Sequence, residues 1–153
     1  MIKKLYPNGK SKAFNVSYDD GVLQDVRFVN LLNQYGLKGT FNLNSGLMEN
    51  EFEWIHETGC IVKRLSKENV SSLYDGHEVA SHTLTHPFMQ EKTENEIMKE
   101  LELDKKNLEK LFGRQIKGFA VPFDYYSDLI ESCVKKCGFE YARISEESLS
   151  FVP

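Results

Sequence analysis

Two short segments of this chain carry side chains that could together hold a metal ion. The first places Asp19 and Asp20 directly before Gly21, and the second contains His82 and His86. Two imidazoles and one carboxylate form the ligand set of catalytic metal centres, because three protein ligands leave a position open for water. The other carboxylate is then available for proton transfer. The combination therefore predicts two components of a hydrolytic mechanism: a metal-bound water and a carboxylate that accepts its proton.

The spacing of the two histidines sets a requirement on local structure. Residues four apart share one face of a helix, so we expect a helical turn between His82 and His86. Gly21 after the aspartate pair predicts a tight turn. Neutral imidazoles with a carboxylate suit Zn²⁺ best, with Co²⁺, Ni²⁺, Mn²⁺ and Fe²⁺ as alternatives. The alternative interpretation assigns no function: the aspartate pair and Gly21 form an ordinary turn, and the two histidines are solvated helix residues. The joint occurrence of both motifs favours the metal site.

The elements that must position these residues alternate between strand-like and helix-like patterns, which is typical of a parallel α/β fold. The expected strands cover residues 13–18, 39–44, 78–82, 118–121 and 141–144. A possible short strand lies at residues 60–62, in the least legible part of the sequence. Both motifs then follow strand ends, where α/β sheets and barrels place their sites.

Helix boundaries are signalled by capping residues. Thr93 and Glu96 form a capping box that opens the longest helix, and Gly113 ends it. Ser127 caps a later helix. An apolar stripe on the helix after the aspartate pair is expected from Phe28, Val29, Leu32 and Tyr35.

Length and composition fit a single domain over residues 1–153 with ordinary apolar content of 41%. The net charge of −4 argues against a nucleic-acid partner. No segment has the pattern of a membrane span or a signal peptide, so we expect a cytoplasmic protein, or an extracellular one if a leader was removed. Three cysteines exclude a complete disulfide framework, and Cys133 and Cys137 are expected to be buried thiols on one helix face.

The two motifs resemble the first two motifs of the polysaccharide deacetylase family, the chitin-deacetylase-like enzymes of carbohydrate esterase family four. A third motif is similar to Phe119–Asp124, and the resemblance spans about residues 14–144. It implies a metal-dependent hydrolase of carbon–nitrogen, non-peptide bonds that removes N- or O-acetyl groups from a glycan. It further implies that Asp20, His82 and His86 bind the metal and that Asp19 is the general base.

The resemblance also implies roles around the third motif. The backbone N–H of Phe123 would stabilise the oxyanion, and Pro122, Phe123 and Tyr125 would contact the substrate. Many family members carry an arginine that orients the base, whereas this chain has Ala120 at the corresponding place. The family takes its general acid from a histidine in its last motif. The remaining histidines here, His56 and His77, are not expected to replace it.

The family fold is a distorted (β/α) barrel of about seven strands. With five strands, we expect an incomplete barrel that lacks the C-terminal part, with flanking helices and a homo-oligomer that covers the open edges near residues 141–153. Two other functions stay open: a catalytically impaired member that binds metal and glycan, and an oligomerising structural fragment.

Overall fold

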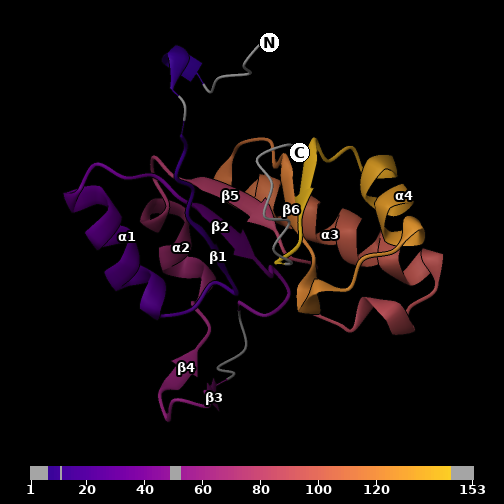
Figure 1. Cartoon of the computed structure of the whole chain (residues 1–153). Coiled ribbons are helices and arrows are strands. Elements are labelled where there is room, and N and C mark those ends of the chain that lie inside the picture. Colours follow the sequence, from indigo (N-terminus) through magenta and orange to yellow (C-terminus); the bar gives the residue numbers. More distant parts are fainter. Residues whose placement is uncertain (1–6, 11, 49–52, 146–153) are drawn as a thin grey trace.

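The computed structural model describes residues 7–10, 12–48 and 53–145. Five strands form one parallel sheet in the order β1-β2-β5-β6-β7 (Figure 1). They are β1 (Ser17–Asp19), β2 (Thr40–Leu43), β5 (Glu78–Ser81), β6 (Gly118–Ala120) and β7 (Tyr141–Arg143). All five expected strands are confirmed, each shorter than predicted. The predicted α/β fold, an incomplete barrel of parallel strands with flanking helices, is also confirmed.

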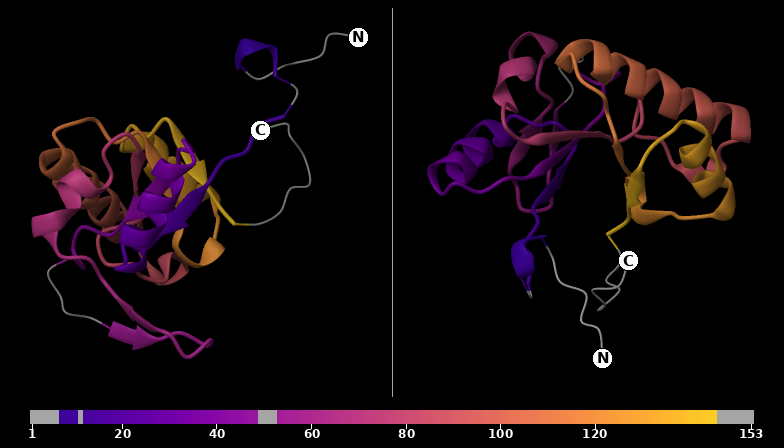
Figure 2. Two further views of the ribbon diagram at one scale, coloured as in Figure 1. Left: turned by 90° about the vertical axis from the view of Figure 1, so that its left-hand side faces the viewer. Right: turned by 90° about the horizontal axis from the view of Figure 1, so that it is seen from above.

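Four α-helices lie along the outer face of the sheet (Figure 2). They are α1 (Gln24–Gln34), α2 (Lys67–Leu73), α3 (Glu94–Phe112) and α4 (Asp128–Lys136), and short 3-10 segments occupy Pro7–Gly9, Met89–Glu91 and Pro122–Asp124. The strands lie side by side in the order in which they follow one another in the chain, so successive right-handed crossovers place the helices on one face. This winding is that of a barrel and not of a doubly wound sheet.

The sheet is strongly curled. In a flat sheet of five strands, the two edge strands would be about 19 Å apart, which is four inter-strand spacings. Instead, Arg143 at the end of β7 forms an ion pair with Asp19 at the end of β1. The carboxyl ends of the edge strands therefore approach each other across the concave face.

A two-stranded antiparallel hairpin, β3 (Glu53–Ile55) and β4 (Ile61–Lys63), leaves the body between β2 and α2 (Figure 1). The possible strand at residues 60–62 corresponds to β4, whereas β3 was not expected. The hairpin projects beyond the carboxyl ends of the parallel strands, at the bottom of Figure 1. It therefore lies at the edge where the two motifs end.

The capping predictions are confirmed. Thr93 and Glu96 form a reciprocal capping box, and Gly113 ends α3 in the left-handed conformation. The Ser127 hydroxyl accepts a hydrogen bond from Ile130 N–H at the start of α4. The stripe on α1 was wrong at one position: Tyr35 is 68% exposed, because it lies past the last turn of the helix.

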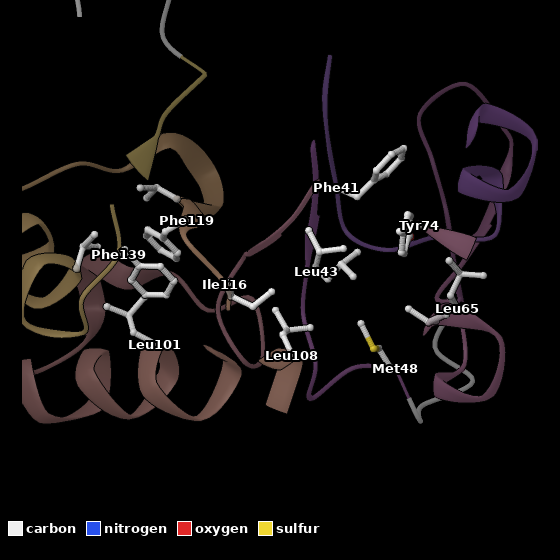
Figure 3. Close-up of a cluster of buried hydrophobic side chains, with 14 of the residues drawn as sticks. Phe41, Leu43, Met48, Leu65, Tyr74, Leu101, Leu108, Ile116, Phe119 and Phe139 are labelled. Atoms are coloured by element: carbon white, nitrogen blue, oxygen red, sulfur yellow. The ribbon is translucent and has the colours of Figure 1, made fainter. Parts of the chain in front are cut away.

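The core lies between the outer face of the sheet and the helices (Figure 3). Phe41 and Leu43 alternate along β2 and are both buried on its helix-covered face, where the Phe41 ring packs against Tyr74 with centroids 4.7 Å apart. Asn42 between them therefore faces the concave side. Cys133 is buried and Cys137 is half-buried, both as free thiols. Among helices in the described ranges, none is long and apolar enough to cross a membrane.

Candidate metal centre and active site

The structure brings Asp20, His82 and His86 together at the carboxyl end of the sheet. One ligand atom from each residue lies within 4.8 Å of the other two. His86 Nε2 is 3.6 Å from Asp20 Oδ1. Two ligands about 2.1 Å from one tetrahedral ion are about 3.4 Å apart, so this pair is already close to coordinating geometry.

His82 is oriented by its neighbour strand. Its Nδ1 lies 2.8 Å from the carbonyl oxygen of Ala120 at the end of β6. A carbonyl can only accept, so Nδ1 carries the proton and Nε2 of the neutral ring is left as the ligand atom. Burial lowers the pKa of His82, and burial together with His82 lowers the pKa of His86. Both rings are therefore neutral near neutral pH, as metal binding requires.

The expected helical turn between the two histidines is wrong. The segment after β5 is an irregular loop in which Thr83 and His86 both have positive φ, 67° and 54°. The Thr83 hydroxyl accepts a hydrogen bond from His86 N–H at 3.1 Å, which folds the loop back on itself. Two left-handed residues, and not helical periodicity, turn the two rings toward each other (centroids 4.8 Å apart).

Helix α3 supports the site with two carboxylates one turn apart. Glu100 accepts hydrogen bonds from the backbone N–H and the hydroxyl of Thr85, both at 2.8 Å. Asp104 is fully buried and accepts from Ser45 N–H at 2.7 Å and from the Ser81 hydroxyl at 2.6 Å. Burial raises the pKa of Asp104 to about 7, although both hydrogen bonds oppose the shift. Asp104 thereby ties the ends of β2 and β5 together directly behind His82.

Asp20 occupies the tight turn that Gly21 predicted, with φ of 84° and 61° for the two residues. Its backbone N–H donates to Asn42 O at 2.9 Å, and its carbonyl accepts from Arg64. Arg64 Nη1 also lies 3.0 Å from Asp20 Oδ1, without the alignment of a hydrogen bond. Burial lowers the pKa of Arg64, and the Asp20 carboxylate opposes that shift.

Asp19 is held by an arginine that the sequence did not reveal. Ala120 was expected to leave the base without one, but Arg143 of β7 donates to both oxygens of Asp19, to Oδ2 at 2.6 Å. Asn42 donates to Oδ1 at 2.7 Å. Burial alone would raise the pKa of Asp19, but His82, Arg143 and Asn42 outweigh it and hold the pKa below its ordinary value.

Two asparagines were also missed as site residues. Asn42 and Asn44 are 2% and 1% exposed, so their amides must find hydrogen-bond partners. Asn44 donates to the carbonyls of His82 and Thr83, to the latter at 2.9 Å, and accepts from Arg64 at 2.8 Å. The available signal was an Asn-Leu-Asn pattern at a strand end, where one face must be polar.

The third motif lies beside the histidines. The Phe123 ring packs against His86 with centroids 4.6 Å apart and stacks on Phe88 at 4.0 Å. Phe123 has a φ of 55°. Pro122 is buried, and Tyr125 is exposed on the surface that follows.

A groove of about 420 Å³ lies between the sheet edge and the hairpin. Three residues of the hairpin region line one side of the groove: Trp54, His56 and Val62. The other side is lined by residues at the sheet edge: Ser17, Tyr18, Asp19, Asp20, Val22, Arg143 and Ser145. His56 therefore faces the candidate site. His77 instead lies buried at the amino end of β5, at the opposite end of the sheet.

The model of the polysaccharide deacetylase family matches residues 7–142 of this chain. The chain belongs to the polysaccharide deacetylase family.

Solved structures of other family members share this fold. The Streptococcus pyogenes deacetylase PplD, solved in complex with acetate, superposes with a TM-score of 0.77 over 90% of this chain and 57% of its own, at 19% identity. A carbohydrate esterase family 4 pseudoenzyme from Bacillus anthracis gives a TM-score of 0.68 over 90% of this chain and 44% of its own, at 18% identity. At these identities the likeness establishes the fold alone.

A sequence relative is the Bacillus subtilis protein YlxY, 28% identical over 123 residues, which cover 79% of this chain and 34% of YlxY. The chain thus spans between 34% and 57% of the length of these three relatives.

Members of this family generally use a divalent metal, and the donor set of this deacetylase fold fits one. Asp20 Oδ1 is buried and has no hydrogen-bond donor among the described residues. Arg64 Nη1 lies 3.0 Å away, so this oxygen has an ion-pair partner but no aligned hydrogen bond. It lies beside two neutral imidazoles, so a divalent cation would satisfy all three groups.

Proposed function

We propose that this chain hydrolyses acetyl groups from an acetylated carbohydrate with the aid of a divalent metal, Zn²⁺ in the simplest case. The proposal rests on one observation. A cluster of one carboxylate and two imidazoles lies next to a second carboxylate, that of Asp19, which Arg143 and Asn42 hold in place by hydrogen bonds. Asp20, His82 and His86 would hold the ion. A divalent ion there would polarise the acetyl carbonyl and make an attacking water more acidic.

Asp19 is the general base in this proposal. Its lowered pKa keeps the carboxylate ionised at neutral pH, ready to accept a proton from water. Arg143 and Asn42 fix both of its oxygens, so the base keeps its orientation while the substrate enters. Arg143 thus takes the place of the arginine that the third motif lacks.

The third motif would bind the acetyl group. The backbone N–H of Phe123 would donate to the developing oxyanion, and the packing of its ring on His86 keeps this backbone beside the metal ligands. Pro122, Phe123 and Tyr125 would contact the substrate, which fits the exposed rings of Phe123 and Tyr125.

His56 is the candidate proton donor to the leaving amine. It lines the same groove as Asp19, although the sequence suggested no donor. Its Nδ1 lies 2.9 Å from the Thr58 hydroxyl, so Nε2 is the nitrogen that would deliver the proton, from the imidazolium form of the ring. A groove of this size admits a sugar unit between His56 and Asp19.

Acetate release tests the proposal. The Zn²⁺- or Co²⁺-loaded protein should release acetate from a chitooligosaccharide or a peptidoglycan fragment. The second candidate is a catalytically impaired member that binds metal and glycan, which the likeness to a pseudoenzyme favours. Binding of both without acetate release would select that candidate. Absence of metal binding would leave a structural fragment.

We also propose that the chain forms a homo-oligomer. Among the described residues β7 is an edge strand of the sheet, and an edge strand can offer backbone groups for pairing. Residues 146–153 of the expected interface lie outside the described residues. Light scattering should show a dimer or larger assembly at micromolar concentration, and a stable monomer would contradict this. The cytoplasmic location stays a prediction.

A further inference from the structure

The β3–β4 hairpin presents two different faces. Side chains alternate across a strand, so Trp54 and His56 share one face of the hairpin, and Val62 pairs opposite Trp54 on the same face. All three line the groove. Ile55 and Ile61 form a cross-strand pair on the other face and are 75% and 58% exposed. The aromatic residue of the hairpin is therefore on the side of Asp19 and Asp20.

The hairpin is tied to the turn that carries Asp20. Leu23 N–H donates to Lys63 O at 2.8 Å, and Leu65 N–H donates to Gly21 O at 2.9 Å. These two backbone bonds flank a bridge between Val22 and Arg64. The base of the hairpin is thus hydrogen-bonded directly to the turn that carries Asp20.

Arg64 connects this turn to the indole of Trp54. Its guanidinium carbon lies 5.4 Å from the centroid of the Trp54 ring, within cation–π distance. The side chain of Arg64 is 7% exposed and is fixed on Asp20 and Asn44. A buried cation anchored at two points holds one face of the indole and limits its rotation. Trp54 is therefore a preorganised part of the groove wall.

We propose that Trp54 is a stacking platform for a pyranose ring of the acetylated glycan, in a subsite beside Asp19 and Asp20. The identity of the ligand rests on the proposed function. One face of a pyranose presents mainly C–H groups, which suit the large apolar surface of an indole, while the hydroxyls at its rim need polar partners. Asp19, Arg143 and His56 in the same groove supply such partners. The groove thus combines an aromatic surface with polar partners, as a sugar ring requires.

The chain offers a direct reporter, because Trp54 is its only tryptophan. We would titrate the Asp19→Asn variant, which is expected to bind substrate without turnover, with chitotetraose and with an acetylated xylo-oligosaccharide. At least one probe should produce a saturable change in tryptophan emission, with the same Kd by calorimetry. Binding that leaves the emission unchanged, or no binding of either probe, would overturn the inference.

Substitutions on the two hairpin faces give the matched comparison. Trp54→Ala should weaken binding by about 3- to 10-fold and raise KM with little change in kcat, and Trp54→Phe should retain part of the affinity. Ile55→Ala, on the opposite face, should bind as the parent does. Equal affinity of Trp54→Ala and Ile55→Ala would refute the platform. Acetate release with a silent Trp54 would refute this inference alone, whereas a responsive Trp54 without acetate release would refute only the proposed activity.

Discussion

The two ends of strand β5 each carry a buried histidine, and the contrast between them shows what makes a metal ligand. His77 is 3% exposed and His82 is 2% exposed, and burial lowers the pKa of both. Both ring nitrogens of His77 are hydrogen-bonded: Nδ1 accepts from Gly39 N–H at 3.2 Å, and Nε2 lies 3.0 Å from Asn33 Oδ1. His82 has one nitrogen bonded to Ala120 O and directs the other at Asp20 and His86. Burial alone therefore does not distinguish a metal ligand, whereas a second ring nitrogen that faces other candidate ligands does.

The backbone conformation shows the same contrast between the two edges of the sheet. Described non-glycine residues with positive φ are Asn8, Asp20, Thr83, His86, Phe123 and Asp124, and all but Asn8 lie at the carboxyl edge. Such conformations are uncommon outside glycine and persist where surrounding contacts impose them. Local strain is thus concentrated at the edge that carries the candidate site, while the amino edge is relaxed.

The largest effect is expected for Asp19→Asn. The amide has nearly the same shape but cannot accept the proton, so kcat should fall by about 100- to 10,000-fold while metal content stays unchanged. Acetate release and elemental analysis measure the two properties. If Asp19→Asn lost metal and Asp20→Asn kept it, the two roles would be reversed.

A pair of arginines sharpens the comparison between the two edges. Arg143→Met removes the group that holds both oxygens of Asp19, so activity should fall by about 10- to 100-fold with metal retained. Arg114 donates to His77 O at 2.9 Å at the amino edge, and Arg114→Met should leave kcat unchanged. Equal losses of kcat in the two variants would show that Arg143 acts through general stability.

A smaller effect is expected in the pH dependence of stability. The pKa of Asp104 is raised to about 7, so the folded state binds a proton that the unfolded state releases above about pH 4. Its stabilising contribution is complete below about pH 4 and is lost as the pH rises through about 7. Between about pH 5 and about pH 8, the free energy of unfolding should fall by about 2–3 kcal/mol more in the wild type than in Asp104→Asn. Denaturant titrations at both pH values measure this difference, and exposed Asp75→Asn is the control. The same pH dependence in wild type and Asp104→Asn would contradict the raised pKa.

Much of the fold could be predicted from the sequence because its signals are local. Strand ends, the Thr93 capping box and the left-handed Gly113 each depend on a few neighbouring residues. The motif residues also follow strands whose carboxyl ends must share an edge. Topology alone therefore brought Asp20 near His82.

The rest depends on contacts between distant segments. Arg143 reaches Asp19 across 124 positions only because the sheet curls, and no local pattern encodes that curl. The loop from His82 to His86 looked helical by spacing, but contacts of Thr85 with Glu100 and a hydrogen bond to Thr83 impose another path. The groove wall around Trp54 depends on Arg64, which the sequence presents as one more charged residue in a loop.

Metal content tests the central claim most directly. The wild type, loaded with Zn²⁺ or Co²⁺, should hold about one ion per chain by elemental analysis. His82→Ala should lose tight binding, because two remaining ligands hold an ion weakly, whereas His77→Gln at the other end of β5 should keep the full content. Unchanged metal content in folded His82→Ala, or equal losses in both variants, would contradict the assignment of the site.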